Sequence, residues 1–84
     1  MANKVLAEDW SNYDNRKIRD NRDSRFFSCE EKWERDFLKH KIHRIYPRFR
    51  ITKIEAAMEL CCKGSSGPRP RRIFVECVIT ILNG

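Results

Sequence analysis

Basic and aromatic side chains are concentrated in the stretch FLKHKIHRIYPRFRITKI, which runs from Phe37 to Ile54 without a carboxylate. Basic side chains neutralise phosphate groups, and aromatic rings stack on nucleic-acid bases. A second acid-free segment, from Leu60 to Val75, carries further basic residues. These two segments predict a non-catalytic protein that binds nucleic acid, DNA or RNA, or another polyanion. The candidate contacts are Lys41, Arg44, Tyr46, Arg48, Phe49, Arg50, Lys53, Arg69, Arg71 and Arg72.

A simpler interpretation explains part of this charge. Lys39, Lys41 and Arg44 fall in the last turns of a predicted helix, where cations complement the negative end of the helix dipole. The net charge of +6, from 18 bases and 12 acids, also fits an ordinary soluble surface. The arginines at 48 and 50 and Lys53 escape this explanation, and the binding hypothesis joins them with the arginines at 69, 71 and 72 into one surface.

Four cysteines and two histidines are potential metal ligands, but their spacing does not favour a metal site. His40 and His43 stand alone with two residues between them, and the adjacent Cys61 and Cys62 should point to different helix faces. We therefore predict no metal and no cofactor. The sequence also lacks the Walker, G-x-S-x-G, H-E-x-x-H and C-x-x-C motifs, so we predict no enzymatic activity.

The first residues, MANKVLAEDW, lack the apolar core of a signal peptide. No stretch approaches the roughly 20 apolar residues of a membrane span. These features predict a cytoplasmic protein without a membrane partner. In that compartment the four cysteines should be reduced thiols, some of them packed as small hydrophobic residues.

Helical periodicity in the second half of the chain predicts three main helices, near 29–46, 53–63 and 71–82. Ser28 with Glu31, and Thr52 with Glu55, match capping boxes that would begin the first two. Pro47 should end the first helix and Gly64 the second, with an extended linker from Pro47 to Ile51. The predicted core consists of Trp33, Phe37, Leu38, Ile42, Ile45, Ile54, Met58, Phe74, Val78 and Ile81.

The C-terminal segment IFVECVITIL permits two interpretations. Arg72, Glu76, Thr80 and Asn83 form a polar stripe at helical spacing, which favours a buried helix, whereas the β-branched residues leave a core strand as the alternative. The chain is then all-α, or α+β if the strand forms. A helix-turn-helix is disfavoured, because the connection before this segment is too long and the segment too apolar to lie in a groove. Its apolar surface could instead meet a protein partner or a second copy in a homodimer.

Residues 1–27 are predicted to be an N-terminal arm or anchor, and residues 28–84 a small helical domain. The stretch from Ser11 to Arg25 shows neither helical nor strand periodicity and should be irregular. Leu6, Trp10 and Tyr13 fall at helical spacing, so they could dock a short helix onto the domain.

The stretch from Asp23 to Leu38 has an Asp and an Arg before an apolar pair, then Glu31, Trp33-Glu34 and Phe37-Leu38. It resembles a group of small bacterial proteins known only as a domain of unknown function, and the segment from Ile51 to Gly64 is similar to their second helix. The resemblance covers about half the chain and implies a small helical domain in a bacterial cytoplasm. The basic residues from His43 to Arg50 and the loop SSGPRPRR depart from the pattern, and the family supplies no site residue.

Overall fold

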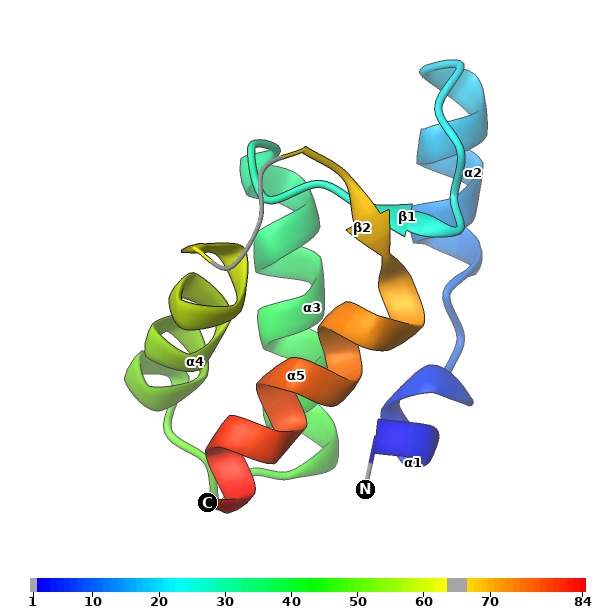
Figure 1. Ribbon diagram of the computed structural model, residues 1–84. Coiled ribbons are helices and arrows are strands. Elements are labelled where there is room, and N and C mark those ends of the chain that lie inside the picture. Colours follow the sequence, from blue (N-terminus) through cyan, green and yellow to red (C-terminus); the bar gives the residue numbers. More distant parts are fainter. Residues whose placement is uncertain (1, 64–66) are drawn as a thin grey trace.

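The computed structural model describes residues 2–63 and 67–84 of the chain. These residues form a mostly helical domain with one pair of very short strands (Figure 1). In chain order the elements are α1 (Ala2–Leu6), α2 (Ser11–Arg19), β1 (Phe26–Phe27), α3 (Lys32–Ile45), α4 (Ile51–Lys63), β2 (Arg69–Pro70) and α5 (Arg71–Asn83). The radius of gyration of 11.9 Å agrees with the roughly 12 Å expected for a folded chain of this length. No helix in the described ranges is long and apolar enough to cross a membrane.

The segment expected to be irregular contains a regular helix, α2, and that prediction was wrong. The Asp9 carboxylate accepts a hydrogen bond from the Ser11 amide at 2.9 Å, and hydrogen bonding to Ser11 lowers the pKa of Asp9. At the other end, Asn21 adopts a left-handed conformation with φ of 61°. The amides of Asn21 and Arg22 donate to the carbonyls of Ile18 and Lys17. This Schellman arrangement satisfies the last carbonyls and ends the helix.

Helices α3 and α4 lie close to their predicted positions, but neither begins at the predicted capping box. Helix α3 begins at Lys32, and the hydroxyl of Ser28 donates to Glu30 rather than capping the helix. Helix α4 begins at Ile51, so Thr52 is already inside it. The predicted stop at Pro47 is confirmed, because α3 is capped by Tyr46. The predicted end of α4 at Gly64 lies outside the described residues.

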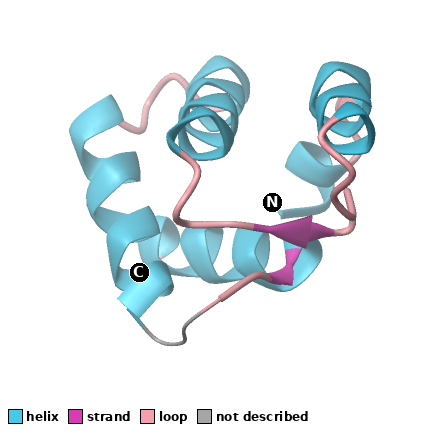
Figure 2. Cartoon of the chain, turned by 90° about the horizontal axis from the view of Figure 1, so that it is seen from above, coloured by secondary structure: helices cyan, strands magenta, loops and turns pink. Residues whose placement is uncertain are grey.

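The C-terminal segment is helix α5, which confirms the helical interpretation over the strand. Figure 1 shows α5 crossing in front of α3, with α4 on one side and α1 on the other. The strand pair joins the two halves of the chain at the start of α5 (Figure 2), because Phe26 pairs with Pro70 and Phe27 with Arg69. Phe27 stacks on Phe74 of α5 with ring centroids 4.3 Å apart.

The core combines the three long helices with the N-terminal segment. Six predicted members are buried, and Trp33, Phe37 and Ile45 pack against them while half-buried. Ile81 was placed in the core wrongly, since it is 38% exposed. Trp10 and Tyr13 of the N-terminal segment are buried in this core, but they do not share one helix with Leu6, because α1 ends at Leu6 and α2 begins at Ser11. The buried hydrophobic residues that the predicted core lacks are Val5, Trp10, Tyr13, Phe27, Ala57, Cys61, Val75 and Ile79.

All four cysteines form disulfides, so the prediction of reduced thiols was wrong. Cys29 pairs with Cys62 and Cys61 with Cys77, with Cα atoms 6.0 and 6.1 Å apart. Neither disulfide could be predicted from the sequence, because the paired cysteines come together only when α4 packs against α5 and against the segment before α3. Disulfides persist mainly in oxidising compartments, which weighs against the expected cytoplasmic location.

Candidate polyanion-binding surface

Two of the ten candidate contacts are buried and serve the fold. The ammonium of Lys41 donates to the Asp9 carbonyl at 2.8 Å, and burial lowers the pKa of Lys41. The guanidinium of Arg69 contacts the sulfur of Cys29 and lies over the ring of Phe74. Both side chains are less than 10% exposed, so they are poorly placed to meet a phosphate.

Three further candidates, Arg44, Arg71 and Arg72, form ion pairs with carboxylates of the same chain. Arg44 Nη2 lies 2.8 Å from Glu8, and Arg71 Nη1 lies 2.9 Å from Asp14. Arg71 also lies over the ring of Trp10, 4.4 Å from its centroid, and thereby ties α5 to the N-terminal segment. Arg72 pairs with Glu76 one turn away in α5, at 3.5 Å. A phosphate would have to compete with these carboxylates.

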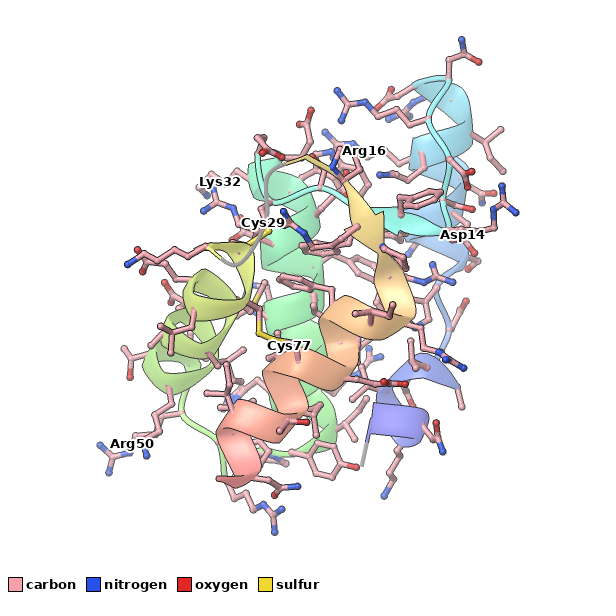
Figure 3. The ribbon with its side chains drawn as sticks, viewed as in Figure 1. Asp14, Arg16, Cys29, Lys32, Arg50 and Cys77 are labelled. Atoms are coloured by element: carbon pink, nitrogen blue, oxygen red, sulfur yellow. A yellow bond between two sulfur atoms is a disulfide. The ribbon has the colours of Figure 1, made fainter. Side chains whose placement is uncertain are left out.

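The remaining basic candidates lie at or just after the turn between α3 and α4. Arg48, Arg50 and Lys53 are exposed, and Arg50 extends away from the end of the molecule (Figure 3). In the described part of the chain, neither Arg50 nor Lys53 has a carboxylate within ion-pair distance. The turn itself is tight rather than extended, since the Phe49 amide donates to the Tyr46 carbonyl at 3.0 Å. The predicted extended linker was therefore wrong, although both arginines do face solvent.

Helix α1 adds a cation that the sequence analysis did not select. The ammonium of Lys4 lies over the ring of Tyr46, 5.9 Å from its centroid, although 42 positions separate the two residues in the chain. Lys4 is exposed and likewise has no ion-pair partner among the residues the structure describes. We refer to Lys4, Arg48, Arg50 and Lys53 together as the turn patch.

The two aromatic candidates are half-buried beneath these cations. The Tyr46 and Phe49 rings lie 5.9 Å apart, and Arg48 sits over both, 4.9 Å from the Phe49 centroid. The Phe49 carbonyl lies 2.9 Å from Nδ1 of His43, which fixes the turn against α3. Because the rings pack against the core and already bear cations, they support the patch instead of offering open faces to bases.

The most prominent polar cluster was missed by sequence reasoning. Glu34 is completely buried and accepts three hydrogen bonds: from Tyr13 Oη at 2.7 Å, from Lys17 Nζ at 2.9 Å and from the Ser28 amide at 3.0 Å. These bonds link α2, α3 and the segment after β1. In the sequence, the one indication of this cluster was the four-residue spacing of Tyr13 and Lys17, which places them on one face of a helix.

This cluster does not form an open site. All its charged and polar atoms are used within the protein, and the pocket beside Lys17 and Ser28 is lined by neither Tyr13 nor Glu34. Burial, followed by the hydrogen bond to Glu34, raises the pKa of Tyr13 far above its usual value of 10. Within the described residues, no three His, Cys, Asp or Glu side chains come together as metal ligands.

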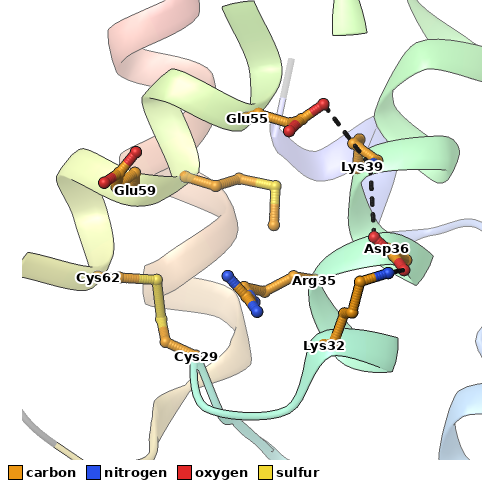
Figure 4. A pocket seen from close by; sticks show the side chains of 9 residues that line it. Cys29, Lys32, Arg35, Asp36, Lys39, Glu55, Glu59 and Cys62 are labelled. Carbon is orange, nitrogen blue, oxygen red and sulfur yellow. Dashed lines mark hydrogen bonds and ion pairs between the residues drawn. A yellow bond between two sulfur atoms is a disulfide. The ribbon is translucent and has the colours of Figure 1, made fainter. Parts of the chain in front are cut away.

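A larger pocket, of about 540 Å³, lies between α3 and α4 (Figure 4). It contains the Cys29–Cys62 disulfide together with charged side chains of both helices. None of the ten candidate contacts lines it. The pocket and the turn patch thus have no residue in common.

Comparison of the chain with protein-family models, with curated proteins and with solved structures found no match. The resemblance to small bacterial helical proteins therefore stays a prediction, and no activity or ligand can be carried over from a relative.

Proposed function

We propose that this protein is a non-catalytic binding protein that contacts nucleic acid or another polyanion through the turn patch. The observation that carries the proposal is the exposure of Lys4, Arg50 and Lys53 without a carboxylate partner in the described part of the chain. Cations held by carboxylates gain less from meeting a phosphate, whereas these three have no such competitor among the residues that the structure describes. Residues from two elements distant in sequence contribute to one end of the molecule.

The expected mechanism is counterion release with little reading of base identity. Four cations can neutralise at most about four phosphates, so affinity should be modest and strongly dependent on salt. Insertion of α5 into a groove of DNA is not supported, because α5 buries Phe74, Val75, Val78 and Ile79 in the core. Base stacking has little support either, since Tyr46 and Phe49 are half-buried.

Fluorescence anisotropy with labelled single-stranded DNA, duplex DNA and RNA, each at several salt concentrations, tests the proposal. Four phosphate contacts give a log–log slope of about −3.6 for duplex and about −2.8 for single strands. The triple variant R48A/R50A/K53A should lose most of this slope. Absence of binding at low salt would end the proposal.

A matched control removes the same charge elsewhere. In R19A/R25A/K32A three exposed cations of α2, the loop after it and the start of α3 are lost, and each of them has a nearby carboxylate. This variant should retain the slope of the unmodified protein. An equal loss of binding in both triple variants would show that net charge alone, and not the turn patch, is responsible.

Self-association through α5 is a second candidate, favoured by the exposure of apolar side chains. Ile73 and Ile81 are 57% and 38% exposed and lie two turns apart on one face, and Leu60 of the neighbouring α4 is 57% exposed. Light scattering over a range of concentrations tests this idea. A dimer that I73E abolishes is the expected result, and a monomer at the highest concentration would contradict it.

A further inference from the structure

The pocket between α3 and α4 places a disulfide beside charged groups of both signs (Figure 4). Cys29 and Cys62 both line it and are partly exposed. Its volume of about 540 Å³ falls within the range of small-molecule sites. The other disulfide differs, because neither Cys61 nor Cys77 lines the pocket and Cys61 is buried.

The two sulfurs of the pocket disulfide have opposite electrostatic surroundings. Cys29 precedes the first residue of α3 by three positions, and the guanidinium of Arg69 contacts its sulfur. Cys62 is the penultimate residue of α4, close to the negative end of that helix dipole. A positive group next to sulfur stabilises a thiolate, whereas the C-terminal end of a helix does not. Cys29 is therefore the better leaving group of the pair.

Two charged residues of the pocket lack an oppositely charged partner within the described ranges: Arg35 on α3 and Glu59 on α4. The other ionic residues already interact, since Lys32 and Lys39 pair with Asp36, and Lys39 also with Glu55. In Figure 4 the Arg35 guanidinium points toward the disulfide. A guanidinium binds a carboxylate, and a carboxylate binds an ammonium group, so the two residues together suit a ligand of amino-acid type.

We propose that this pocket is a thiol-exchange site for a low-molecular-weight thiol that carries both a carboxylate and an ammonium group. The incoming thiolate attacks Sγ of Cys62 and forms a new disulfide with it. The bond between Cys62 and Cys29 breaks, and its electron pair leaves on Cys29, whose thiolate Arg69 stabilises. The product is a mixed disulfide at Cys62, and attack by Cys29 on that bond restores the starting state. No additional oxidant or reductant takes part.

Incubation with reduced glutathione, followed by rapid quenching with iodoacetamide, tests this site. Peptide mass mapping should place glutathione on Cys62 and carbamidomethyl on Cys29, while Cys61 and Cys77 stay paired. First modification at Cys61 or Cys77, glutathione on Cys29, or no adduct on the folded protein would overturn the proposal.

The preference for a thiol that carries a carboxylate is tested by comparing glutathione with cysteamine, which has the ammonium group but no carboxylate. After each rate is normalised to that of a short peptide disulfide, glutathione should react about three- to tenfold faster, a ratio equivalent to one partly screened ion pair. R35Q should remove most of this preference, whereas R72Q, which changes an exposed arginine outside the pocket, should keep it. Equal rates for both thiols, or an unchanged preference in R35Q, would contradict the assignment.

The role of Arg69 needs a separate variant because the residue is buried. In R69Q the preference for attack at Cys62 over Cys29 should fall, with folding checked by circular dichroism. If R69Q does not fold, the R35Q comparison still decides whether the pocket selects its thiol. A folded R69Q that keeps the full preference for Cys62 would overturn the leaving-group argument.

Discussion

Lys17 and Glu34 form an ion pair inside the protein, with Nζ 2.9 Å from Oε2 and both side chains at most 3% exposed. The pair connects α2 to α3, and the second oxygen of Glu34 accepts hydrogen bonds from Tyr13 and from the Ser28 amide. A buried carboxylate with these partners is fully satisfied, so its main effect is to fix where α2 docks.

Removal of one charge from this pair should be costly. In E34Q the ammonium of Lys17 stays buried without a counter-charge, and we expect a loss of about 3–5 kcal/mol in the free energy of unfolding. The double variant K17M/E34Q should recover a large part of that loss. Urea denaturation measures both. D36N, which removes the ion pairs of Asp36 with Lys32 and Lys39 at the surface, serves as the control and should change stability by less than about 1 kcal/mol.

Stability should decline steeply at alkaline pH because the pKa of Tyr13 is raised by burial and by its hydrogen bond to Glu34. Below about pH 10, Tyr13 is protonated in both states and this stabilisation is complete. Above that pH the unfolded tyrosine ionises, while the folded one stays protonated until the pH reaches its raised pKa. The free energy of unfolding then falls by about 1.4 kcal/mol per pH unit.

Absorbance titration of phenolate in a Y46F background checks this expectation, because Tyr13 is then the only tyrosine. Its ionisation should coincide with unfolding followed by circular dichroism. Ionisation near pH 10 in a protein that stays folded would contradict it.

Lys41 and Arg50 should behave as opposites, although both are candidates from one basic stretch. K41M leaves the Asp9 carbonyl without its donor and should cost about 1 kcal/mol of stability, with the salt dependence of polyanion binding unchanged. R50Q should alter stability by less than about 0.5 kcal/mol and reduce the slope by about 0.9. Urea denaturation and salt-dependent anisotropy on the same two proteins separate the roles. A change of slope in K41M would show that Lys41 is accessible to the ligand.

Each disulfide should contribute substantially to stability. The pairs close loops with sequence separations of 33 and 16 residues, for which loop entropy gives about 3–4 kcal/mol each. The variants C29A/C62A and C61A/C77A should therefore unfold at lower urea concentration than the oxidised protein. Protein purified without reductant should show no free thiol after denaturation. Recovery of four free thiols would contradict the pairing.

Sequence periodicity located α3, α4 and α5 because each has an apolar stripe that packs on the others. It failed for α2, whose inward face consists of Tyr13 and Lys17 while its aliphatic residue, Ile18, is 67% exposed. A lysine that buries its stem and pairs with a glutamate 17 positions away looks like a surface residue in the sequence. Only the tertiary partner reveals its role.

The candidate surface, like the helices, was predictable only where it depends on local sequence and not on tertiary partners. The exposure of Arg48, Arg50 and Lys53 follows from their places at the turn and the start of α4. The pairing of Arg44 with Glu8 and of Arg71 with Asp14 depends on how the N-terminal segment docks, which the local sequence does not determine. All these cations contribute equally to the net charge. In the structure, some of them form contacts that stabilise the fold, whereas others face solvent.

The neighbouring cysteines of α4 also make disulfide pairing depend on helical phase. Successive residues of an α-helix are rotated by about 100°, so Cys61 faces α5 and Cys62 faces the segment before α3 only when the last turn of α4 has formed. Before that, the two thiols are interchangeable, and either could react with either partner. The winding of one helical turn thus selects the native pairing over the one in which Cys61 and Cys62 exchange partners.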